Sequence, residues 1–323
     1  MEPWHSGLWM VGVCAAMSAP TAALFVALAA LLWSAGGVGV RNIEASAFAI
    51  AGLRSLFALP VLAALCLQQA SAHEVSLSAM LRARRVQLAA LAYAFLVSCF
   101  VIAAKRTTAA NAIFLEYTSP IYIAFLSWKF LGERIRRWDV VAIVGCFFGL
   151  GCCVGGSLGG GRIDGDFIAL LSGVAFGVMP VIMLLERRAL HARGCDAAGD
   201  MVPVVALTLG NALTAGVMLS VTGLSHAAMP ADSRSWLIVA AMGVLQIGVP
   251  YGLYGLAIPH LRAVQSTLIA MLEPVLSPVW VFLVNGEIPG LGTLAGGALI
   301  VSSLVVQAVW SANAQRLEKK PRP

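Results

Sequence analysis

Charged residues are scarce in this chain. Asp, Glu, Lys and Arg make up 11% of its 323 residues, against roughly 25% in a soluble domain. Hydrophobic residues make up 60%, and the mean hydropathy is +0.88. The apolar residues fall in runs of about 20, the length at which a helix crosses roughly 30 Å of hydrocarbon. A soluble fold is therefore excluded, and we expect an all-α integral membrane protein.

The chain also lacks the patterns that would indicate an enzyme, a metal site or an ATP-driven pump. It has no HExxH motif, and its glycine-rich segment at 155–162 lacks the Gly-Lys-Ser/Thr of a phosphate-binding loop. The seven cysteines are odd in number and show no CxxC spacing, and the five histidines share no metal-ligand spacing. We predict no catalytic residues, no metal and no cofactor.

Apolar windows, broken at charge and turn clusters, predict ten transmembrane helices arranged as two halves of five. The ten spans cover residues 21–40, 46–68, 86–104, 108–130, 140–156, 167–185, 201–222, 235–258, 263–285 and 290–311. The corresponding organisation is an N-terminal tail at 1–20, a first five-helix unit at 21–157, a second at 165–311 and a basic tail at 312–323. Translation starts at either Met1 or Met17 in this scheme.

The basic residues predict the orientation of these spans. With a cytoplasmic N-terminus, 15 of the 21 Lys and Arg residues lie on the cytoplasmic side, five lie on the opposite side, and Arg54 lies within a span. The positive-inside rule therefore predicts a multi-pass protein of the cytoplasmic membrane with both termini inside. Membrane topology and lipid contacts explain the net charge of +6 without a nucleic-acid partner.

Two stretches 154 residues apart resemble one another. Pro120 is followed by Gly132-Glu133, and Pro274 is followed by Gly286-Glu287, with the same spacing in each case. Both stretches form the fourth helix of a five-helix half, and an odd number of helices per half orients the two halves oppositely. This pattern predicts an inverted repeat, which is typical of transporters, although two apolar helices can also resemble one another by chance.

Several short motifs together resemble the EamA-like permeases of the drug/metabolite transporter superfamily, over about residues 20–312. They are Leu32-Trp33-Ser34, Gly52-Leu53-Arg54, Glu116-Tyr117-Thr118-Ser119-Pro120 with Leu131-Gly132-Glu133, and Leu272-Glu273-Pro274 with Gly286-Glu287. One departure is Asn285, where the usual pattern has leucine. The resemblance implies a carrier driven by protons or another gradient, often an exporter of amino acids or related metabolites, with a central cavity between the halves.

Three ionisable residues lie far from the ends of their predicted spans: Arg54, Glu116 and Glu273. A charge at that depth costs several kcal/mol, so each side chain should face a cavity, pair with an opposite charge or be neutral. One hypothesis is that Glu116 or Glu273 binds the ammonium group of a substrate or takes up a coupling proton. The alternative is a structural ion pair with Arg54.

Prolines and polar side chains inside the spans extend this candidate site. Pro120, Pro274 and Pro278 are predicted helix breaks that free backbone carbonyls beside the two acids. Other candidates for the lining of a cavity are polar or aromatic: Trp33, Asn111, Tyr117, Gln246, Tyr251, Tyr254 and Gln265. Hydrogen bonds between helices are the alternative role for each of them.

These features predict a secondary transporter that moves a small metabolite by alternating access, with export inferred from the resemblance. A helical scaffold or sensor and a lipid-handling membrane protein are the alternatives. The scaffold would need an ion pair to explain the buried charges. The sequence leaves open the substrate, the direction, the coupling ion and whether the chain forms a homo-oligomer.

Overall fold

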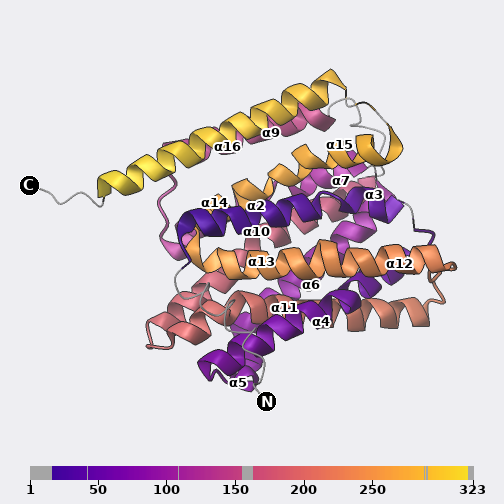
Figure 1. The fold of residues 1–323 in the computed structure, drawn as a ribbon, viewed down its shortest axis with the longest axis horizontal. Coiled ribbons are helices and arrows are strands. Elements are labelled where there is room, and N and C mark those ends of the chain that lie inside the picture. Colours follow the sequence, from indigo (N-terminus) through magenta and orange to yellow (C-terminus); the bar gives the residue numbers. More distant parts are fainter. Residues whose placement is uncertain are drawn as a thin grey trace, which may run out of the picture.

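The computed structural model describes residues 17–41, 43–107, 109–154, 163–286, 288 and 290–318, and within these ranges its regular elements are all helices (Figure 1). In chain order they are α2 (Ala19–Trp33), α3 (Gly36–Arg41), α4 (Ala47–His73), α5 (Leu77–Arg82), α6 (Arg84–Arg106), α7 (Ala109–Glu116), α8 (Ser119–Leu126), η2 (Ser127–Leu131), α9 (Arg137–Val154), α10 (Ile163–His191), α11 (Asp196–Leu224), α12 (Ser233–Ala241), η4 (Met242–Gly248), α13 (Val249–Ala257), η5 (Ile258–His260), α14 (Ala263–Ala270), α15 (Leu272–Asn285) and α16 (Leu291–Glu318). Most of the predicted N-terminal tail, the segment at 155–162, Glu287 and residues 319–323 lie outside the described residues.

Among the described residues, six helical segments are long and apolar enough to cross a membrane. They are Ala47–His73, Arg84–Arg106, Ile163–His191, Asp196–Leu224, Ser233–His260 and Leu291–Trp310. The other four predicted spans coincide with shorter or divided helices: α2 with α3, α7 with α8 and η2, α9, and α14 with α15. The chain is therefore a membrane-embedded, multi-pass helical protein, and the total of ten crossings stays a prediction.

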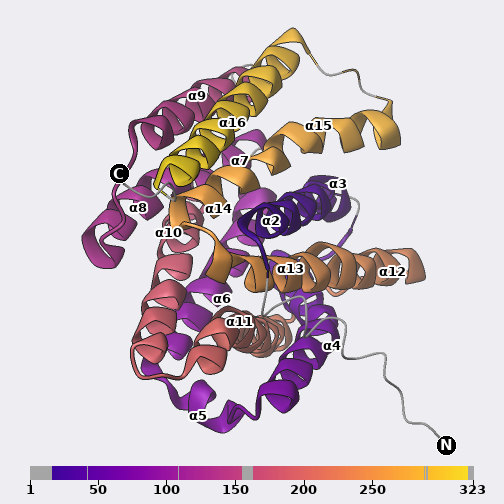
Figure 2. The same ribbon diagram turned by 60° about the vertical axis from the view of Figure 1, so that its left-hand side comes forward.

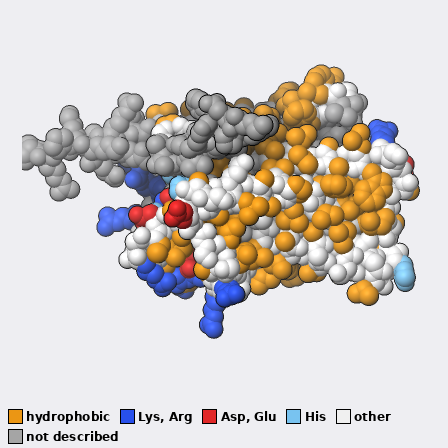
Figure 3. Space-filling view, turned by 60° about the horizontal axis from the view of Figure 1, so that its bottom comes forward, with side chains coloured by type: hydrophobic (Ala, Val, Ile, Leu, Met, Phe, Trp, Pro, Cys, Tyr) orange, Lys and Arg blue, Asp and Glu red, His pale blue; other side chains and the backbone are white. Residues whose placement is uncertain are grey.

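The side chains on the outside of the bundle fit this placement. Large apolar residues such as Phe148, Leu237 and Leu283 are more than half exposed, as expected of groups that face lipid rather than water. Figure 3 shows hydrophobic side chains spread along one face, with Lys and Arg gathered mainly at one end of the bundle. The same end holds the C-terminal part of α16 (Figure 1).

Equivalent helix boundaries recur at the spacing of 154 residues. The pairs are the ends of α7 and α14 at Glu116 and Ala270, the ends of η2 and α15 at Leu131 and Asn285, and the starts of α9 and α16 at Arg137 and Leu291. After each broken helix a glycine adopts the left-handed conformation, with φ of 63° at Gly132 and 70° at Gly286, where a side chain would be strained. In Figure 2, α7 to α8 and α14 to α15 run in opposite directions.

A close helix contact positions the break between α7 and α8. A Cβ atom at Gly173 of α10 would lie 2.6 Å from the carbonyl oxygen of Leu115 and 2.8 Å from that of Glu116. Only a residue without a side chain allows this approach, which brings α10 against the backbone where the helix ends. Gly173 therefore sets the distance between α10 and the central break.

We predict that Gly173→Ala lowers the stability of the protein by about 1–3 kcal/mol, because the added methyl group meets backbone rather than a movable side chain. Thermal unfolding of the purified protein in detergent measures the change. Gly151→Ala is the matched control, since a Cβ there meets nothing within 4 Å, and a helical alanine is no worse than glycine. Equal melting temperatures for the two variants would contradict the close contact.

Candidate functional site

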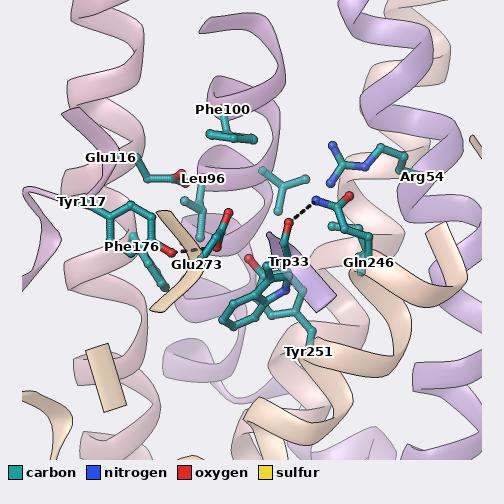
Figure 4. A pocket seen from close by; sticks show the side chains of 12 residues that line it. Trp33, Arg54, Leu96, Phe100, Glu116, Tyr117, Phe176, Gln246, Tyr251 and Glu273 are labelled. Atoms are coloured by element: carbon teal, nitrogen blue, oxygen red, sulfur yellow. Dashed lines mark hydrogen bonds between the residues drawn. The ribbon is translucent and has the colours of Figure 1, made fainter. Parts of the chain in front are cut away.

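A small cavity lies where helices from both halves of the chain meet (Figure 4). It is lined by Trp33, Arg54, Leu96, Val97, Phe100, Glu116, Tyr117, Phe176, Gln246, Ile247, Tyr251 and Glu273. Its volume is about 40 Å³, enough for a water molecule but well below the roughly 300–1,000 Å³ of pockets that hold drug-sized ligands. A metabolite can bind here only if the surrounding helices move apart.

The structure brings together seven of the ten predicted lining residues: Trp33, Arg54, Glu116, Tyr117, Gln246, Tyr251 and Glu273. Tyr254 lies behind them, with its ring centroid 5.7 Å from that of Trp33. Asn111 lies elsewhere and donates to Asp166 Oδ1 over 3.0 Å. Gln265 is half-buried on α14 and does not line the cavity.

Sequence reasoning missed the apolar part of the lining, which consists of Leu96, Val97, Phe100, Phe176 and Ile247. Nothing in the sequence distinguishes these residues from leucines and phenylalanines that face lipid, because both kinds occur in the same apolar runs. Only the packing of the helices determines which of them face the cavity.

The two helix breaks meet at Tyr117, which lies in the turn between α7 and α8. Its hydroxyl is 2.7 Å from Glu273 Oε2 and 3.0 Å from the carbonyl oxygen of Ala270. Pro274 has no N–H to donate to that carbonyl, so the tyrosine supplies the missing donor. One side chain from the first half thus completes the broken helix of the second half.

The prolines differ in their effect on the helices. Pro120 is the second residue of α8 and Pro274 the third of α15, so each lies in the first turn of the helix that follows a break. The predicted break at Pro278 is wrong, because α15 continues through it from Leu272 to Asn285. A single proline removes one backbone hydrogen bond, and the remaining bonds can hold such a helix together.

The two acids have different neighbours. The Tyr117 hydroxyl shares its single proton between Glu273 Oε2 and the carbonyl oxygen of Ala270, whereas Glu116 Oε1 lies 3.2 Å from Ser172 Oγ of α10. Ser172 Oγ is also 3.2 Å from the carbonyl oxygen of Leu96. Each carboxyl group is thus held by a hydroxyl on a neighbouring element, which leaves its other oxygen able to meet a ligand or a proton.

Arg54 lies on the opposite side of the cavity from Glu116 and Tyr117 (Figure 4). Its side chain is 2% exposed, and Nε and Nη1 have no hydrogen-bond partner in the described part of the chain. No carboxylate of a described residue lies within 4.0 Å of its guanidinium group. The alternative of a direct ion pair between Arg54 and either glutamate is therefore not realised in this structure.

Aromatic rings form the wall between these charged groups. The ring centroids of Trp33 and Tyr251 are 4.8 Å apart, and Tyr93 packs edge-on against Tyr251 at 4.7 Å. Gln246 Nε2 donates to the carbonyl oxygen of Trp33 over 3.2 Å and so ties η4 to α2. Tyr93, which sequence reasoning did not single out, is held by a 2.9 Å hydrogen bond from Asn211.

A second polar cluster joins helices at the basic end of the bundle. Asp139 in the first turn of α9 is fully buried and accepts from Arg262 Nη2 at 2.8 Å and from Gln307 Nε2 at 3.1 Å. Arg188 pairs with Glu133 at 3.0 Å and also donates to the carbonyl oxygen of Leu131. The sequence indicated only the topological role of these arginines, because their partners lie more than 50 residues away.

No metal centre accompanies these clusters within the described ranges: no group of three His, Cys, Asp or Glu side chains is placed to hold an ion. The chemistry available at the cavity is therefore that of two carboxyl groups, one guanidinium group and several aromatic and amide dipoles. Such groups can bind a charged ligand and exchange protons with it.

Comparison with known proteins gives a consistent result. The sequence pattern of the EamA-like transporter family matches this chain twice, at residues 20–154 and 164–308. An uncharacterized transporter of Archaeoglobus fulgidus is 24% identical over 282 residues, which cover 87% of this chain and 94% of the relative. The uncharacterized transporter YdfC of Bacillus subtilis is 25% identical over 221 residues, 66% of this chain and 67% of the relative.

A solved crystal structure of another protein has the same fold. It superposes with a TM-score of 0.72 at 20% sequence identity, covering 91% of this chain and 99% of that one. At this identity the likeness concerns the arrangement of the helices alone.

We predict that Tyr117→Phe destabilises the protein by about 1–3 kcal/mol, because it leaves the buried carbonyl of Ala270 without its donor. Thermal unfolding in detergent measures the loss. Tyr122→Phe is the matched control from the neighbouring helix α8, since the Tyr122 hydroxyl makes no hydrogen bond among the described residues. If the two variants unfold at the same temperature, the Tyr117 hydroxyl does not support the break.

Proposed function

Because the chain belongs to the EamA-like transporter family, we propose that this membrane transporter is a secondary carrier that exports a small metabolite, an amino acid or a related amphiphile. One observation carries the proposal. The central cavity lies where the broken helix of each half ends, and it is lined by both acids, Glu116 and Glu273. Discontinuous helices at mid-depth are where secondary transporters place their substrate and ion sites.

The proposed mechanism is alternating access between two inverted five-helix halves, with ten crossings and both termini in the cytoplasm. Two properties of the structure support it. The contacts of Asp139 with Arg262 and Gln307 hold together the end that we assign to the cytoplasm. Towards the other end, a second small cavity shares Phe100, Gln246 and Glu273 with the first. We infer a conformation closed to the cytoplasm.

The orientation has a direct test with two reporters fused after residue 318, one active only in the cytoplasm and the other only in the periplasm. We expect activity from the cytoplasmic reporter alone. Activity of the periplasmic reporter instead would reverse the assignment of the two ends. The alternative of a non-transporting scaffold loses its main support, since Arg54 does not lock a helix pair through an ion pair. The proposed partners are a small-molecule substrate, protons and the surrounding lipids.

Growth of the host strain tests the transported class and the direction. We predict that overexpression raises resistance to toxic amino-acid analogues and that deletion of the gene lowers it, because an exporter reduces the internal concentration. Saturable counterflow of the same radiolabelled compound in proteoliposomes would establish that the carrier is responsible. Sensitivity on overexpression would indicate uptake, and no counterflow across a broad panel of metabolites would reject the carrier.

The two glutamates are proposed to divide ligand binding and proton coupling between them. We predict that Glu→Gln at the coupling position abolishes substrate movement driven by an imposed pH gradient but leaves counterflow, since exchange needs no net proton transfer. The same change at the binding position lowers both fluxes. Glu44→Gln is the control, because Glu44 is exposed before α4.

Proteoliposomes that contain Glu116→Gln, Glu273→Gln or the control, at matched protein content, separate these cases. Gradient-driven flux at the wild-type rate in both cavity variants would show that neither acid couples protons. Such a result would leave the carrier itself in place.

A further inference from the structure

The guanidinium group of Arg54 is explained neither by the helix breaks nor by the proposed proton coupling. Arg54 is the eighth residue of the 27-residue helix α4, and it is 2% exposed. Two of its nitrogens, Nε and Nη1, are buried without a hydrogen-bond partner among the described residues. An arginine stays protonated in a protein, so these unpaired donors carry a cost that a bound anion would remove.

The backbone at Arg54 is held in place by close packing. A Cβ atom at Gly243 of η4 would lie 2.7 Å from the carbonyl oxygen of Arg54, and one at Gly52 would lie 2.8 Å from Cγ of Leu219. Both glycines let neighbouring helices approach α4 on either side of the arginine. The guanidinium group therefore projects into the cavity from a fixed helix, and Figure 4 shows it directed towards the centre of the lining.

The charged groups of the cavity are separated by sign. Arg54 lies on one side, and Trp33, which also lines the cavity, has a buried indole Nε1 without a hydrogen-bond partner. The carboxyl groups of Glu116 and Glu273 come from the other side (Figure 4). The guanidinium group thus faces the two carboxyl groups across a space enclosed by aromatic rings, and Gln246 Oε1 is an unpaired acceptor in the same lining.

We propose that Arg54 binds the carboxylate of the transported molecule, and that the substrate is a zwitterion whose ammonium group lies towards Glu116 and Glu273. The assignment rests on the proposed function and adds the residue that binds the carboxylate and the orientation of the ligand. A guanidinium group presents two parallel N–H donors that match a carboxylate. A ligand with only an amine leaves Arg54 unpaired, and one with only a carboxylate leaves an acid facing no cation.

The cavity is too small for such a ligand in the present conformation, so binding must widen it. A ligand that joins Arg54 on α4 to Glu273 on α15 bridges elements of the two halves. No ion pair joins Arg54 to either glutamate in the described part of the chain. The two charges of the ligand would supply the opposite charges that these side chains lack. The charge separation of the ligand thereby becomes a requirement for recognition.

Ligand-dependent thermal stabilisation of the purified protein tests the proposal without any flux. Each probe set contains an amino acid, its amide and its decarboxylated amine, for example L-leucine, L-leucinamide and 3-methylbutylamine, with matching sets for phenylalanine, threonine and lysine. We expect an amino acid to bind tightest and its two analogues to bind at least about thirtyfold more weakly, as for the loss of one partner of a buried charge pair.

Variants of Arg54 then show whether this residue causes the preference for an amino acid over its amide and amine. Arg54→Gln should lower the affinity for the amino acid to that of its amine and leave the affinity for the amine unchanged, whereas Arg54→Lys should give an intermediate value. Arg106→Gln is the matched control, because it removes the same charge from an exposed ion pair with Asp164 and should change neither affinity. The comparison of the three probes on the unmodified protein stands even if Arg54→Gln does not fold.

Three results would overturn the assignment. They are equal affinity of the unmodified protein for an amino acid and its amine, retention of the amino-acid preference in Arg54→Gln, and no stabilisation by any probe. Counterflow in proteoliposomes distinguishes this failure from that of the proposed function. Saturable flux of an amine or another metabolite would keep the carrier and reject only the zwitterion, whereas no flux of any metabolite would reject both.

Discussion

The hydrogen bond from Tyr117 to the second half is the contact on which the central site depends. Hydrocarbon offers no partner for a backbone carbonyl, so a helix can be broken inside the membrane only where protein groups replace the lost bond. Pro274 removes that bond for Ala270, and the hydroxyl of Tyr117 replaces it while also contacting Glu273. A side chain at the break in the first half therefore supports the break in the second.

The same requirement explains why the charged groups are concentrated at two levels of the bundle. At the basic end, Asp139 is buried and its carboxylate receives hydrogen bonds from Arg262 and Gln307, so the charge is compensated. At the central cavity, Arg54 has unpaired donors and the acids are held only by hydroxyl groups. A cluster with satisfied charges suits a closed end, and one with unsatisfied charges suits a place that a ligand completes.

Close helix packing makes these placements rigid. Gly173 brings α10 against the break between α7 and α8, and Gly243 brings η4 against α4 at Arg54. Movement of one half against the other would then shift whole helices rather than single side chains, since a packed interior resists gradual deformation. Both contacts join the first half to the second, so the proposed alternating access requires these two interfaces to slide or open.

Much of this organisation could be predicted because the membrane leaves strong signals in a sequence. The low content of charged residues determined the class of fold, and the repeated proline and glycine-glutamate spacing located the broken helices. The three ionisable residues inside the predicted spans indicated the cavity, since each departs from an apolar run. The break expected at Pro278 was wrong, because α15 continues through that position. A proline alone does not tell whether the neighbouring turns hold the helix together.

Only the tertiary structure decided which groups meet. The apolar lining residue Phe176 and the buried Asp139 have no distinguishing local pattern, and Arg54 was as compatible with an ion pair as with a free guanidinium group. These outcomes depend on the relative positions of helices far apart in the chain. The sequence by itself determined that the chain lies in a membrane, that it contains a repeat and which ionisable residues are candidates for the site, because these follow from composition and spacing. Which of these charged groups pair with one another depends on how the helices pack, so only the tertiary structure decided it.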